Sequence, residues 1–136
     1  MFCLDTNILI FALNERKPGI AERLRHELAS GATIFIPTFA MFELDYGVAK
    51  SANPVKSRAI LDAFLSAGFL ALAFDLEDAR EAGDVRGYLE RRGTPIGPYD
   101  VLIAAQARRR GAALVTLNRR EFDRVPGLMV TDWGGA

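Results

Sequence analysis

The sequence predicts a single three-layer α/β domain over residues 1–136, in which helices cover both faces of a parallel sheet. Short runs of apolar and β-branched residues, which are typical of buried strands, alternate with longer amphipathic segments, which are typical of helices. Strands separated by helices form βαβ units, and right-handed crossovers then place helices on both faces of the sheet. Half of the residues are apolar, and a chain of this length can bury a sizeable core.

The first half of the chain contains two expected strands, each followed by a helix. The apolar run Phe2-Cys3-Leu4 stops at Asp5, which either caps the next helix or presents its charge to a ligand. Pro37 stops the second strand, so Thr38 is the expected N-cap of the helix that follows. We expect, in order, a strand over 2–4, a helix from residue 8, a helix over 20–29, a strand over 33–36 and a helix over 39–50.

Capping residues also mark the helices of the second half. Asn53 followed by Pro54 is a helix start signal, and Asp75 is an expected N-cap. Glycines at positions 68, 93 and 111 suit helix C-termini. We expect helices over 54–67, 76–92 and 99–110, strands over 70–74, 113–116 and 128–130, and one helical turn over 119–122.

The composition limits the classes of function. The 17 basic side chains are balanced by 17 acidic ones, without the basic excess usual for non-specific nucleic-acid binding, although a site rich in carboxylates would cancel a basic patch elsewhere. Cys3 is the only cysteine, so no intramolecular disulfide can form, which fits a reducing compartment. No apolar run is long enough to span a membrane, and Asp5 interrupts the stretch that a cleavable leader would need. We therefore expect a cytoplasmic protein without a membrane partner.

Four acidic residues that are far apart in the sequence are expected at the same edge of the sheet. Asp5 ends the first strand, and Glu43 lies in the early turns of the helix after the second strand. Asp100 lies in the first turn of the helix before the fourth strand, and Glu121 follows that strand within a few residues. Because helices of βα units begin at the carboxyl edge of the sheet, where ligands bind in open α/β folds, the four carboxylates are predicted to converge.

Convergence of like charges favours a cation at this edge. Two carboxylates about 4 Å apart repel by about 4 kcal/mol at an effective dielectric of about 20. Oxygen ligands of this kind suit Mg²⁺ or Mn²⁺, which can lower the pKa of a bound water and neutralise charge on a phosphodiester under attack. The candidate metal ligands are Asp5, Glu43, Asp100 and Glu121, and the short polar side chains expected to orient them or their waters are Thr6, Asn7, Thr116 and Asn118.

Two other interpretations fit the same acids. In the first, the chain is a binding module in which each acid only caps a helix or complements its dipole. In the second, Asp5 is the nucleophile of a phosphatase or phosphotransferase, although such sites commonly carry a second acid two residues later, where this chain has Asn7. Other acids are expected to face away, cap helices or lie on solvated faces, and are not predicted ligands: Asp45, Asp75, Glu77, Asp78, Glu81 and Asp84.

The arginines fall into short clusters. Those at 91–92 and 108–110 are expected at helix C-termini and on solvated faces. Arg119, Arg120 and Arg124 differ, because they flank Glu121 at the proposed catalytic edge and are candidates for holding the phosphates of a nucleic-acid backbone.

The acids and their neighbours resemble the motifs of PIN-domain ribonucleases, specifically the VapC toxins of type II toxin–antitoxin pairs. The resemblance spans the whole chain and keeps the order and spacing of the motifs. Arg119 stands where many members of the family carry a polar residue, which bears on substrate choice. The matching segments are Leu4-Asp5-Thr6-Asn7, Phe42-Glu43-Leu44 with Tyr46-Gly47, residues 96–105, residues 114–118 with Glu121-Phe122, and residues 125–133.

The resemblance implies a five-stranded parallel sheet in the order 3-2-1-4-5 and Mg²⁺- or Mn²⁺-dependent cleavage of tRNA or rRNA, which inhibits translation and growth. It implies Asp5 and Asp100 as the principal metal ligands, with Glu43 next and Glu121 in a less fixed role. It also implies a homodimer and a cognate antitoxin. In the resulting toxin–antitoxin hetero-oligomer, the C-terminal segment of the antitoxin blocks the active site, often through an inserted arginine.

Overall fold

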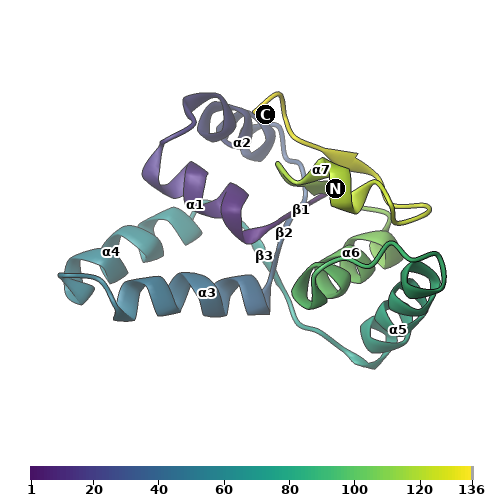
Figure 1. The fold of residues 1–136 in the computed structure, drawn as a ribbon. Helices are drawn as coiled ribbons and strands as arrows, with labels where there is room; N and C mark the ends of the chain where they lie inside the picture. The colour runs from purple at the N-terminus through teal and green to yellow at the C-terminus, as the bar shows by residue number, and fades with distance from the viewer. Residues whose placement is uncertain (136) are drawn as a thin grey trace.

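The computed structural model describes residues 1–135 and contains a five-stranded sheet with helices on both faces (Figure 1). No helix within this described range combines the length and apolarity needed to cross a bilayer. The strands are β1 (Phe2–Leu4), β2 (Ile34–Pro37), β3 (Leu70–Leu72), β4 (Ala113–Val115) and β5 (Val130–Thr131). The helices are α1 (Thr6–Asn14), α2 (Pro18–Ala29), α3 (Thr38–Ala49), α4 (Pro54–Leu65), α5 (Leu76–Arg91), α6 (Pro98–Arg110) and α7 (Arg119–Phe122).

The sheet is parallel throughout, in the order β3-β2-β1-β4-β5, which confirms the predicted fold class and strand order. The central strand β1 pairs with β2 on one side and β4 on the other, so that Phe2 lies opposite Ile34 and Ala113. The carboxyl ends of these three strands therefore lie next to one another. This edge carries Asp5, the first turn of α3 and the segment that leads into α7.

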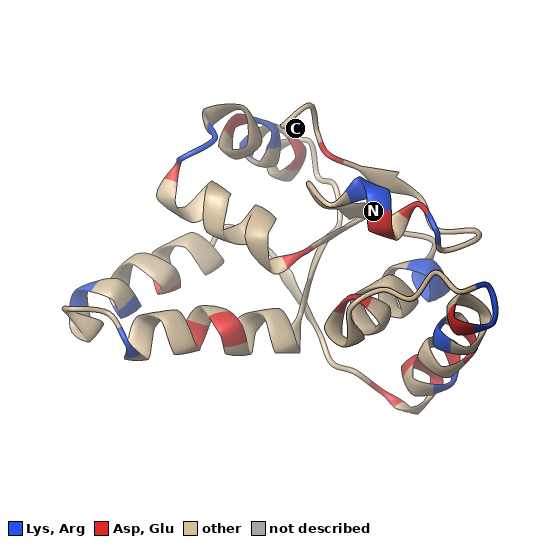
Figure 2. Ribbon diagram, viewed as in Figure 1, with Lys and Arg blue, Asp and Glu red and all other residues tan. Residues whose placement is uncertain are grey.

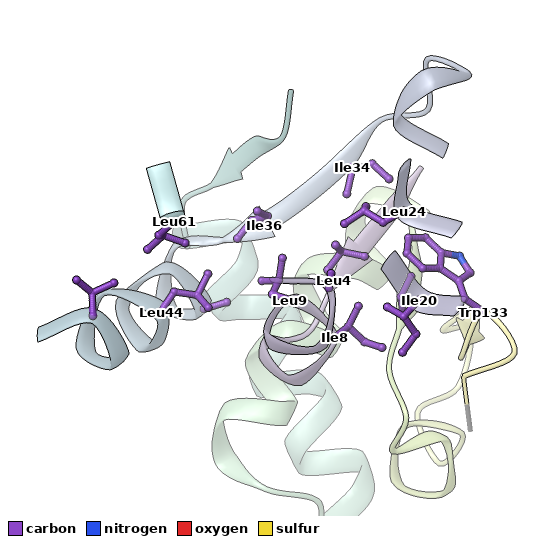
Figure 3. Packing of buried hydrophobic residues seen from close by; sticks show 14 residues of the cluster. Leu4, Ile8, Leu9, Ile20, Leu24, Ile34, Ile36, Leu44, Leu61 and Trp133 are labelled. Atoms are coloured by element: carbon purple, nitrogen blue, oxygen red, sulfur yellow. The ribbon is translucent and has the colours of Figure 1, made fainter. Parts of the chain in front are cut away.

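Alternate residues of the central strands point into two separate cores. Leu4 and Val115 belong to the core under α1–α4, whereas Cys3 and Leu114 belong to the core under α5 and α6. Figure 1 shows the two groups of helices on opposite sides of the sheet, and Figure 3 shows Leu4 in the first core, with Trp133 at one end. A register slip of one residue would exchange the two sets of side chains, so the position of each strand end is strongly specified.

The boundaries of some elements differ from the prediction. Pro37 occupies the N-cap position of α3 without a side-chain hydrogen bond, so the expected N-cap at Thr38 is wrong by one residue. β3 ends at Leu72, two residues earlier than predicted, and β5 begins and ends later than predicted. Periodicity cannot set the ends of such short strands. The caps at Asn53 and Asp75 are confirmed, because each side chain accepts a backbone N–H three residues further on.

An ion network that the sequence analysis missed joins the start of α5 to the end of α6. The fully buried Asp78 carboxylate accepts hydrogen bonds from Arg109 at 2.7 Å and Arg110 at 2.8 Å, and Arg108 pairs with Glu81. Burial opposes ionisation of Asp78, yet hydrogen bonds, led by that from Arg110, hold its pKa well below its usual range. The predicted solvated face at residues 108–110 is therefore wrong, because it packs against α5.

Candidate active site

A cleft of about 290 Å³ opens beside the carboxyl end of β1. Three of the four predicted acids line it, and Figure 2 shows acidic segments of α3, α6 and α7 around the acidic end of β1. The structure thus brings together residues that are separated by up to 95 positions in the chain (Asp5 to Asp100). The full lining consists of Asp5, Thr6, Asn7, Phe39, Glu43, Gly97, Pro98, Tyr99, Asp100 and Ile103.

Asp5 is both a helix cap and part of the cleft wall. Its Oδ1 accepts the backbone N–H of Ile8 at 2.9 Å, which caps α1. Burial raises the pKa of the carboxyl, the hydrogen bonds from Thr116 and Ile8 oppose this shift, and the charge of Glu43 adds to it. The two roles that the sequence left open, capping and facing a ligand, are therefore compatible in the same side chain.

Asp100 lies in the first turn of α6 and lines the same cleft as Asp5. Burial raises its pKa to about 6, and the charges of Glu121, Asp5 and Glu43 add to the shift. A Cβ atom at Gly97 would lie 3.1 Å from Asp100 Oδ2, so glycine at this position permits the close approach of the carboxylate to the start of the helix. The four predicted acids therefore act on one another electrostatically, although Glu121 does not line the cleft itself.

Short polar side chains donate hydrogen bonds to the other two acids. Thr6 Oγ1 donates to Glu43 Oε1 at 3.4 Å, and Asn118 Nδ2 donates to Glu121 Oε2 at 3.0 Å. Thr116 is fully buried, and its Oγ1 accepts the backbone N–H of Asn118 at 3.0 Å. Thr116 also opposes the raised pKa of Asp5, so the influence of these polar side chains extends from Asp5 to Glu121.

The donor set fits a hard divalent cation. Within residues 1–135, no group of three or more Asp, Glu, His or Cys side chains has the spacing of a formed metal centre. Mg²⁺, however, is usually held by one or two carboxylates and completes its octahedron with waters and substrate phosphates. Carboxylates spaced around an open cleft suit that mode of binding, and a cation would reverse the charge repulsion that raises the pKa of Asp100.

The three arginines predicted to contact an RNA backbone lie around α7 and do not line the cleft. Arg119 Nη1 lies 4.0 Å from Asp132 Oδ2, and Arg124 Nη1 donates to the carbonyl oxygen of Pro95 at 3.0 Å. Arg120 is exposed. The protein itself therefore positions two of the three guanidinium groups, and their contact with RNA stays a prediction.

Sequence reasoning missed the apolar wall of the cleft, which Phe39, Tyr99 and Ile103 supply. Phe39 lies four residues before Glu43 in α3, so both side chains lie on the same helix face. Tyr99 and Ile103 have the same spacing in α6. The signal in the sequence that could have found them is their place beside the predicted acids, with Phe39 four residues before Glu43, Tyr99 directly before Asp100 and Ile103 three residues after it.

The sequence of the chain matches a family model and is similar to named ribonucleases. The family model of the PIN domain matches residues 2–128. The chain is 39% identical to the tRNA(fMet)-specific endonuclease VapC of Salmonella typhimurium, over 97% of each chain. It is 37% identical to ribonuclease VapC2 of Rickettsia felis, over 98% of each chain.

The fold of the chain is also similar to folds in solved structures. The fold matches that in the crystal structure of VapBC2 from Rickettsia felis bound to a DNA fragment from its promoter. The TM-score is 0.86, with 35% identity over 96% of each chain. It also matches DNA-bound VapBC from Salmonella typhimurium, with a TM-score of 0.86 and 39% identity over 97% of each chain.

Proposed function

The chain belongs to the PIN-domain family, among the VapC ribonuclease toxins, and we propose that it hydrolyses phosphodiester bonds of tRNA with Mg²⁺ or Mn²⁺ held in the carboxylate cleft. The observation that carries the proposal is that Asp5 and Asp100, both with raised pKa values, face one cleft together with Glu43. The ribonuclease names of the relatives favour a nuclease over a phosphotransferase or a binding module, and the tRNA specificity in one of those names favours tRNA over rRNA.

The side chains of the cleft would have different roles in binding the cation. Asp5 and Asp100, which both line the cleft, would hold the cation directly, and Glu43 and Glu121 would bind its waters or complete its ligand set. When bound, such a cation lowers the pKa of a water molecule and neutralises charge on the phosphodiester under attack. Thr116 opposes the rise in the pKa of Asp5 and so favours the ionised carboxylate, which a metal ligand requires.

The RNA backbone would approach along α7, where Arg119, Arg120 and Arg124 provide the positive charge that the cleft lacks among its described lining residues. Guanidinium groups bind phosphates through two parallel N–H donors, which fixes the register of the strand without reading its sequence. Arg120 is exposed and has the greatest freedom to turn toward a phosphate.

We further propose that a cognate antitoxin covers this site, in a hetero-oligomer that also contains a homodimer of the chain. The relatives in solved structures are VapBC complexes. Next to the cleft, a groove of about 300 Å³ between α1, α3 and α4 is lined almost entirely by apolar side chains. Glu43 lines both hollows, so a partner segment seated in the groove would end beside the carboxylates. The groove includes Ile10, Leu13, Leu44, Val48 and Ile60.

The test is cleavage of total RNA by the purified protein with Mg²⁺ or Mn²⁺, and then with EDTA. Asp5→Asn removes a proposed ligand. Asp45→Asn is the matched control, because Asp45 lies outside the cleft and accepts a hydrogen bond from Arg58 at 2.6 Å. We expect discrete tRNA fragments from the wild type and from Asp45→Asn, and none with EDTA or from Asp5→Asn. Fragments that persist in Asp5→Asn would contradict the assignment, and fragments of rRNA alone would overturn the choice of substrate.

A further inference from the structure

The cleft carries an aromatic pair directly beside its carboxylates. The ring centroids of Phe39 and Tyr99 lie 6.5 Å apart, with an interplanar angle of 33°. Tyr99 precedes Asp100 in the chain, and Phe39 lies one helical turn before Glu43. Both rings line the same hollow as the acids. The pair therefore forms a wall within reach of any group that the carboxylates and their cation engage.

The two rings are buried to different degrees. Phe39 is half-buried and packs against the core under α5 and α6, which fixes its position. Tyr99 remains 62% exposed and lies against Phe39 on the cleft side. Burial of Tyr99 thus contributes little to the core, and its exposed ring offers a flat apolar surface beside that of Phe39.

The charge of the cleft restricts how RNA can bind there. Three carboxylates line it, and no Lys or Arg is present among its described lining residues. A phosphate backbone is repelled by such a surface unless a cation neutralises it, whereas a base can stack on an aromatic ring whatever the surrounding charge. Unpaired bases of RNA are commonly bound in this way.

We infer that Tyr99, supported by Phe39, stacks an unpaired base next to the scissile phosphate and so positions the RNA strand over the carboxylates. The inference rests on the proposed ribonuclease function and adds a substrate-positioning residue to it. It also requires that the nucleotide beside the cleavage position be unstacked from its neighbours, as in a loop or a single strand. The aromatic ring, and not the hydroxyl of Tyr99, carries this role.

A kinetic comparison tests the role of the ring. Loss of one base–aromatic stack corresponds to a loss of about 5- to 150-fold in binding. We expect Tyr99→Ala to raise KM for tRNA by this factor, with a smaller change in kcat and an unchanged Tm. Tyr99→Phe should restore the wild-type KM, and Tyr99→Leu should not. The matched control is Tyr46→Ala, because Tyr46 is 57% exposed but does not line the cleft.

A binding measurement separates this inference from the ribonuclease assignment, because it needs no cleavage. A short single-stranded RNA carrying 2-aminopurine is titrated with the Asp5→Asn protein at a saturating Mg²⁺ concentration, which offsets the weaker cation binding of this variant, and its fluorescence reports stacking of that base. We expect quenching with the Asp5→Asn protein and with its Tyr99→Phe variant, and little quenching with its Tyr99→Ala variant. Equal quenching by Tyr99→Ala, or none by the protein with Tyr99 intact, would overturn the stacking role even if the wild type cleaves RNA.

Discussion

Replacement of Asp100 by asparagine is expected to stabilise the metal-free protein at and above neutral pH. Burial and the charges of Glu121 and Asp5 raise the pKa of Asp100 from 3.8 to about 6 in the folded protein. The folded protein therefore favours the protonated form of Asp100 more than the unfolded chain does. The stabilisation from protonated Asp100 is fully present below pH 3.8 and is lost as the pH rises through about 6. Asparagine does not ionise and avoids that loss.

The expected gain follows from the pKa. A change from 3.8 to about 6 corresponds to about 3 kcal/mol for a carboxylate that is fully shielded from water. Asp100 is only partly buried, so we expect solvent screening to reduce the gain to about 1–2 kcal/mol. For a domain of this size, the Tm of Asp100→Asn should then exceed that of the wild type by roughly 3–10 °C at about pH 8.

The assay is thermal unfolding in EDTA over a pH series, with the exposed Asp84→Asn of α5 as the matched control. The advantage of Asp100→Asn should grow between about pH 4 and pH 7 and shrink when Mn²⁺ is added, because the cation stabilises only the carboxylate. Asp84→Asn should track the wild type. A Tm of Asp100→Asn below that of the wild type at about pH 8, or a Tm difference that does not change with pH, would show that ionised Asp100 does not destabilise the metal-free protein.

Three further predictions concern the framework around the cleft. Asp78→Ala should cost about 3–5 kcal/mol in urea unfolding, because it removes the buried carboxylate that pairs with Arg110 and leaves Arg109 paired with Asp75 alone. Glu77→Ala, at an exposed ion pair, should cost less than about 1 kcal/mol, and equal costs would contradict this. Phe122→Ala should cost about 3–5 kcal/mol, since the ring is 1% exposed, and a loss below about 1 kcal/mol would show that the core collapses around it. Thr116→Val removes an interaction that opposes the raised pKa of Asp5, so protons should compete more strongly with Mn²⁺ for this carboxylate. The Mn²⁺ affinity measured by calorimetry should therefore fall more at about pH 6 than at about pH 8, and an equal fall at both would argue against this role.

Much of the fold could be predicted because local signals agree with one another. Strands and helices alternate regularly, and side-chain caps at Asn53 and Asp75 mark two helix starts. The boundaries of β3 and β5 could not be predicted, since three or fewer residues carry no periodicity. The network around Asp78 was also out of reach, because a capping acid and a buried ion-pair partner look identical until the packing of α5 against α6 is known.

The acids of the site were predictable for a topological reason. Asp5, Glu43 and Asp100 each lie just after a strand or in an early turn of a helix, and a parallel sheet brings such positions to one edge. The aromatic wall was not predicted, because a ring such as that of Tyr99 carries no charge and is usually interpreted as core. Only the cleft geometry distinguishes a ring that lines the cleft from one that fills a core.

Joint binding of one divalent cation by the carboxylates of the cleft can be measured by Mn²⁺ titration followed by electron paramagnetic resonance. The wild type and Asp45→Asn are expected to bind Mn²⁺ with equal affinity. Asp5→Asn and Asp100→Asn should each weaken binding at least about tenfold, since each removes one of the few protein ligands that such a cation has. Unchanged Mn²⁺ affinity in both variants would contradict the account.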